Sequence, residues 1–87
     1  MKDEDSLIRE RNRGSQARAI IDSPLWEESF SVYRNALMEH MASISSTEEA
    51  VLEARRGLIA LRRIKKHMET IFETGKLANI SLENPNG

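Results

Sequence analysis

The chain has 87 residues, a net charge of −1, a hydrophobic content of 39% and very few aromatic residues. This length allows one small domain with a modest aliphatic core, so we expect self-association to add stability. The absence of cysteine excludes disulfides and thiolate metal sites and suits a cytoplasmic location. The charge differs from the strongly basic balance of many nucleic-acid-binding domains. No apolar run reaches the ~20 residues of a membrane span, so we expect no membrane partner.

Residues 2–22 are predicted to form a first helix. The acidic side chains at its start suit a first helical turn, where the helix dipole favours negative charge. Gly14 lies in a polar stretch and costs about 1 kcal/mol relative to alanine in a helix interior. The pattern leaves open two shorter segments, 5–12 and 15–22, or a mobile N-terminal arm over residues 1–12.

A second helix is predicted over residues 24–42. Proline disfavours helical geometry at Ser23 but is well tolerated at the first helical position, so Ser23 becomes the N-cap. Apolar side chains then recur at steps of four and three, which predicts one buried stripe. The stripe consists of Trp26, Phe30, Tyr33, Leu37 and Met41, widened by Leu25, Val32 and Met38. We expect the centre of the core to lie on this helix.

A third and longer helix is predicted over residues 47–74. Ser46 and Glu49 have the spacing of a capping box at its start. Gly75 is predicted to end it, because glycine best tolerates the left-handed conformation at a helix end. Apolar residues recur with helical spacing at Val51, Ala54, Leu58, Leu61, Ile64, Met68, Ile71 and Phe72.

The predicted fold is all-α, a long antiparallel helical hairpin (about 24–42 and 47–74) with an N-terminal helix packed across it. The hairpin follows from the short connection between its two helices. Residues 13–82 are predicted to form a single helical domain. Residues 83–87 are predicted to be a disordered tail, on the basis of their composition.

The third helix carries a window of arginine and lysine, residues 55–66, that contains no acid. On a helical wheel most of these cations fall opposite the apolar arc. Two parallel rows result, made of Arg55, Arg62 and Lys66 with Arg56 and Arg63 beside them. Leu52 and Ile59 lie inside the same face, and exposed aliphatic residues among arginines indicate a helix-on-helix contact. We name the five cations the basic ridge and predict that it is the interaction surface.

Three interpretations of the basic ridge remain open. It can be a solvated face, supported by local pairs such as Glu53–Arg56 and Lys65–Glu69. It can meet an acidic face of another subunit. It can also meet the phosphates of a nucleic acid, which gives salt-sensitive and largely sequence-independent binding.

No pattern in the chain indicates catalysis. His40 and His67 lack the second histidine or cysteine at helical spacing that a metal site needs. There is no glycine-rich phosphate loop and no setting for a serine or cysteine nucleophile. We therefore predict no catalytic residues, no metal and no cofactor, and we expect that the protein is not an enzyme.

Three strings of the sequence together resemble a family of small helical proteins of tailed bacteriophages and prophages, encoded near packaging and head-assembly genes. They are residues 13–17 (RGSQA) followed by 20–24 (IIDSP), the helical segment around Phe30, and residues 71–78 (IFETGKLA). The resemblance covers roughly residues 13–82 and rests on helix boundaries and a helix C-cap. It implies a phage origin, a location in the host cytoplasm or the virion, and assembly with other copies or other phage proteins.

The leading prediction is a non-catalytic phage-type assembly or DNA-packaging-associated protein. It would act as a homo-oligomer and by binding other phage or host proteins. The alternative is a small nucleic-acid-binding or regulatory protein that uses the basic ridge against phosphates.

Overall fold

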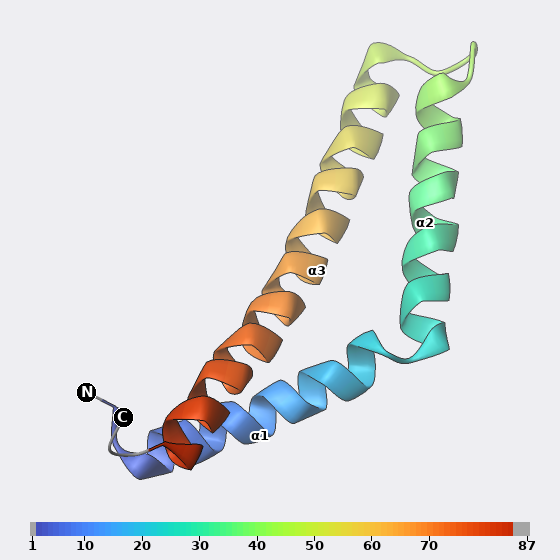
Figure 1. Ribbon diagram of the computed structural model, residues 1–87. Helices are drawn as coiled ribbons and strands as arrows, with labels where there is room; N and C mark the ends of the chain where they lie inside the picture. Colours follow the sequence, from blue (N-terminus) through green and yellow to red (C-terminus); the bar gives the residue numbers. More distant parts are fainter. Residues whose placement is uncertain (1, 85–87) are drawn as a thin grey trace.

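Two shorter helices pack against one long helix. The computed structural model describes residues 2–84, which form α1 (Glu4–Ile21), α2 (Pro24–Ala42) and α3 (Glu48–Glu83). Helix α2 lies beside the N-terminal half of α3, and α1 lies beside its C-terminal half (Figure 1). The predicted all-α hairpin with a packed N-terminal helix is confirmed.

Helix α1 is continuous. Its N-cap is Asp3, whose carboxylate accepts a hydrogen bond from the backbone N–H of Ser6 at 2.7 Å. This bond, together with the nearby Ser6 hydroxyl, lowers the pKa of Asp3 below its ordinary value. The helix then continues through Gly14 to Ile21, so the alternative of two separate segments is wrong.

Helices α1 and α3 contact each other backbone to backbone at Gly14 and Gly75. A Cβ atom built on Gly75 would lie 2.6 Å from the Cα atom of Gly14 and 2.9 Å from the carbonyl oxygen of Glu10. Both glycines are buried, as are Ala17 and Ala78, which lie three residues further along each helix. Residues three apart share a helix face, so each helix presents a matching pair of small residues to the other.

The predicted end of the third helix at Gly75 is wrong. Helix α3 continues to Glu83, and Gly75 does not adopt a positive φ angle. The prediction relied on the conformational freedom of glycine. The structure uses its missing side chain instead, because only a residue without Cβ lets the backbone of α1 come this close. Of the tail predicted over 83–87, Glu83 ends the helix and residues 85–87 lie outside the described part of the chain.

The N-caps of α2 and α3 agree only partly with the sequence prediction. Ser23 occupies the N-cap position of α2 as predicted, although its side chain makes no capping hydrogen bond. The N-cap of α3 is Thr47, whose hydroxyl oxygen accepts from the backbone N–H of Ala50 at 3.1 Å. The predicted capping box is wrong, because the Ser46 hydroxyl donates to the carbonyl oxygen of His40 and so closes the connection.

The molecule is thin and extended. It measures 62 × 26 × 17 Å along its principal axes, so its length is more than twice either of the other two dimensions. Its radius of gyration is 18.4 Å, whereas a compact domain of this length has about 12 Å. The accessible surface is 7003 Å², against about 5,200 Å² for a compact monomer of this mass. The helices therefore form one layer, which leaves about 1,800 Å² more surface in solvent than a compact fold would.

The buried stripe predicted on α2 is narrower than expected. Phe30 is buried, with the Trp26 ring centroid 4.5 Å from its own, and Leu37 and Met41 are half-buried. Tyr33 is 58% exposed, so its predicted burial is wrong. The residues predicted to widen the stripe are exposed as well, namely Leu25, Val32 and Met38. The reason is that α3 is the main neighbour of α2, and one neighbouring helix covers only a narrow face.

Candidate functional site

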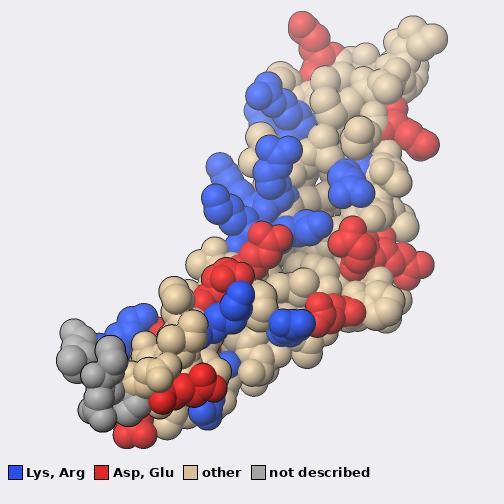
Figure 2. Space-filling view, viewed as in Figure 1, with Lys and Arg blue, Asp and Glu red and all other residues tan. Residues whose placement is uncertain are grey.

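The basic ridge is exposed, as its positions on the helical wheel predict. All five of its side chains lie in solvent on α3, and arginine and lysine gather along this helix in Figure 2. Between residues 2 and 84, none of the five forms an ion pair. The local pairs expected to neutralise the face, Glu53–Arg56 and Lys65–Glu69, do not form. The ridge is thus a row of cations with no acidic partner in the described chain.

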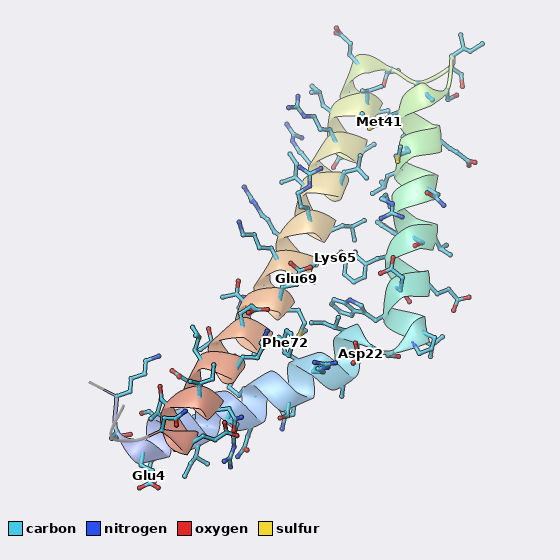
Figure 3. All side chains as sticks on the ribbon, in the orientation of Figure 1. Glu4, Asp22, Met41, Lys65, Glu69 and Phe72 are labelled. Atoms are coloured by element: carbon cyan, nitrogen blue, oxygen red, sulfur yellow. The ribbon has the colours of Figure 1, made fainter. Side chains whose placement is uncertain are left out.

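Lys65 has a structural position apart from the ridge. Its ammonium group lies 3.6 Å from a carboxylate oxygen of Glu27 and 5.7 Å from the centroid of the Phe30 ring (Figure 3). It therefore reaches across from α3 to the first half of α2. A partly buried lysine packs its aliphatic stem while its charged end meets an acid.

A groove of about 950 Å³ follows one side of the line where α2 and α3 meet. We name it the basic groove. Its apolar part is formed by Phe30, Met38, Met41, Leu58 and Leu61. Its charged part is formed by Arg34, Arg62, Lys65 and Lys66, with Glu69 as the one acid among the lining residues. Met41, Lys65 and Glu69 are labelled in Figure 3. Two residues of the basic ridge, Arg62 and Lys66, therefore also line an apolar groove.

A second groove of about 680 Å³ follows the other side of the same line. We name it the acidic groove. Its apolar and small residues include Tyr33, Leu37, Ala50 and Gly57. Its acids are Glu49 and Glu53, accompanied by one arginine, Arg56, and by His40.

The arrangement of residues along α2 explains why the two grooves lie on opposite sides. Tyr33, Leu37 and His40 follow one another at steps of four and three, as do Arg34, Met38 and Met41. Such steps define rows along a helix, and here the two rows flank the face that packs on α3. The sequence showed the apolar spacing but not the grooves, because a groove depends on how far apart α2 and α3 lie.

A third surface lies where α1 meets α3. Two cations lie close to the Phe72 ring, the Arg18 guanidinium and the Lys76 ammonium, each 5.4 Å from the ring centroid. Arg18 also pairs with Asp22 at 3.1 Å, and Lys76 pairs with Glu73 at 3.7 Å. Because both cations have acidic partners, this cluster covers Phe72 and fastens α1 to α3 rather than presenting free charge.

The described residues show no convergence of metal-ligating side chains. Over residues 2–84, no three histidine, aspartate or glutamate side chains gather around a position where an ion could sit. None of the described helices has a stretch long and apolar enough to cross a membrane. Comparison of the chain with protein-family models, with curated proteins and with solved structures finds no match. The two grooves and the basic ridge are therefore the features on which a functional proposal can rest.

Proposed function

We propose that the protein is a non-catalytic assembly protein that acts by self-association and by binding other proteins. The observation that carries this proposal is the surface of the single helical layer. Its excess of about 1,800 Å² over a compact monomer is more than twice the roughly 800 Å² that each partner contributes to a standard protein–protein interface. Another protein chain that packs against this single layer of helices would supply a second layer and bury the excess surface.

The distribution of apolar side chains supports the same proposal. Tyr33 and Met38 are each more than half exposed, and they border the two grooves on either side of α2. Single exposed apolar residues are ordinary on protein surfaces. Here they adjoin apolar grooves, and apolar patches rimmed by polar residues mark interaction sites.

We further propose a phage-type role in head assembly or DNA packaging, with other phage or host proteins as partners. This part rests on the resemblance of the three sequence strings. Of the boundaries in those strings, Ser23 and Pro24 coincide with the start of α2, whereas Gly75 lies inside α3. The proposal places the protein in the host cytoplasm or the virion.

Light scattering coupled to size-exclusion chromatography tests the proposal. The wild-type chain is run at low and high salt, with and without a short DNA duplex. We expect a mass of several copies that persists at high salt and does not change with DNA. Salt does not screen apolar contacts, and it screens charges buried in an interface much less than exposed ones. A monomer under every condition would refute self-association.

A second candidate function is nucleic-acid binding by the basic ridge. The observation in its favour is that its five exposed cations have no ion-pair partner in the described chain. Contacts of this kind release counterions from nucleic acid, so binding would weaken steeply as salt rises. In the same experiment this function predicts a monomer that binds the duplex at low salt only. The double variant Arg55→Glu/Arg62→Glu would then lose that binding while remaining folded.

A further inference from the structure

The two grooves beside α2 carry opposite charge. The basic groove has four cations and one acid among its lining residues. The acidic groove has two acids and one arginine. Each also has an apolar part, to which Met38 contributes on the basic side and Tyr33 on the acidic side. One chain thus presents two different and electrostatically complementary faces.

This charge pattern decides which surface of a second copy fits the basic groove. In a two-fold dimer the same patch meets itself. The basic groove would then oppose Arg34, Arg62 and Lys66 to their own copies, and like charges facing each other across an interface cost several kcal/mol. The acidic groove of another copy offers Glu49 and Glu53 instead. The complementary partner of the basic groove is therefore the opposite face of a neighbouring chain.

We propose that the chain assembles head to tail, with the basic groove of one copy against the acidic groove of the next. This inference rests on the self-association proposed above and specifies its geometry. Each copy uses two different faces, and a standard interface buries about 800 Å² on each partner. Two such faces account for about 1,600 Å², close to the excess surface of about 1,800 Å².

Head-to-tail contacts have a consequence for the number of copies. An interface between two different faces forms a ring if the rotation closes and a filament if it does not. Two copies alone leave one groove of each sign uncovered. The wild-type assembly therefore contains at least three chains, or extends with concentration.

A charge-swap experiment tests this geometry. The first variant, Glu49→Lys/Glu53→Lys, makes both faces basic, and the second, Arg62→Glu/Lys66→Glu, reverses two cations of the basic groove. All four residues are exposed, so the helices have no reason to unfold. We expect each variant alone to associate at least about 100-fold more weakly than the wild type, because each now opposes like charges. An equimolar mixture restores complementary pairs in both directions, and we expect it to recover the wild-type mass.

Matched controls separate the grooves from overall charge. Arg9→Glu/Arg13→Glu on α1 makes the same change of charge as the second swap, at two exposed residues outside the basic ridge. Glu28→Lys/Glu39→Lys on α2 makes the same change of charge as the first swap. None of these four residues lines either groove, so both controls are expected to assemble as the wild type does. Circular dichroism checks that each variant is helical, and the single changes Glu53→Lys and Lys66→Glu replace any double variant that is not.

The outcomes distinguish this inference from the proposed function. A wild-type mass of exactly two copies would overturn the head-to-tail geometry but leave self-association in place. A monomeric wild type would overturn both. Swapped variants that assemble normally, or a mixture that stays dissociated, would overturn the assignment of the two grooves. Equal loss in the swaps and the controls would mean that net charge, and not the grooves, governs assembly.

Discussion

The backbone contact between Gly14 and Gly75 makes a sharp prediction for the substitution Gly75→Ala. The new methyl group would lie 2.6 Å from the Gly14 Cα atom and 2.9 Å from the Glu10 carbonyl oxygen. Ordinary contacts between carbon atoms are about 3.5–4.0 Å. Both obstructing atoms belong to the backbone and cannot rotate away. Helix α1 must therefore move outward by about 1 Å, which also loosens the packing around the buried residues Ala17 and Ala78.

Two opposing effects set the magnitude. Alanine is favoured over glycine in a helix interior by about 1 kcal/mol. Overpacking costs about 1–3 kcal/mol, and we place this site at the upper end because a whole helix has to shift. The net expectation is a loss of about 2 kcal/mol in the free energy of unfolding. For a domain of this size that lowers Tm by roughly 8–16 °C.

The measurement is thermal and urea unfolding followed by circular dichroism, at one fixed protein concentration because association changes apparent stability. Gly57→Ala is the matched control. A Cβ atom there would meet the tip of the Leu37 side chain at 3.0 Å, and that side chain can turn aside. We expect this control to be as stable as the wild type or more stable by up to about 1 kcal/mol. If Gly75→Ala behaved like Gly57→Ala, the close approach of α1 and α3 would be refuted.

Three further predictions concern a cap, a cross-helix contact and a titrating group. Thr47→Ala removes the side-chain acceptor at the start of α3 and should cost about 1 kcal/mol in urea unfolding; an unchanged midpoint would contradict this capping role. Lys65→Ala should lower the free energy of unfolding by about 1 kcal/mol, and Lys65→Met should lower it much less. The reason is that the packed aliphatic stem of Lys65 contributes more than its exposed ion pair with Glu27. Equal losses in the two variants would show that the ion pair contributes more than the stem. The ionised carboxylate of Asp3 stabilises the start of α1, and this lowers its pKa. The stabilisation is complete at pH values above the ordinary pKa of an aspartate and is lost as the pH falls through the lowered pKa. The protection of the Ser6 amide against exchange, measured relative to its intrinsic rate at each pH, should fall in that acidic range, and Asp3→Asn should abolish this pH dependence.

The parts of the fold that local chemistry decides were predictable from the sequence. The boundary between α1 and α2 follows from Pro24, which disfavours the helix before it and suits the first position of the helix after it. The exposure of the basic ridge follows from its position opposite the apolar arc. Neither property depends on where any distant residue lies.

The parts that depend on distant contacts were not predictable in the same way. Glycine differs from other residues in two ways, in its conformational freedom and in its lack of a side chain. Only the position of α1 shows that Gly75 is needed for its lack of a side chain. The exposure of Tyr33 has a similar cause, since its spacing along α2 is that of a buried residue. It is exposed because no second layer of helices covers the first. The grooves likewise arise from the spacing between α2 and α3, which no single segment encodes.

The continuity of α3 also determines how the molecule opens. Helices α1 and α2 pack on different halves of α3 and meet each other only near their junction. Release of α1 therefore loses the contacts at Gly75 and Phe72 but none of those between α2 and α3. Such a chain has two local opening free energies rather than one, which amide exchange resolves as two groups of protected residues. A partner that displaced α1 would leave the α2–α3 unit intact, together with any neighbouring copies bound to its grooves.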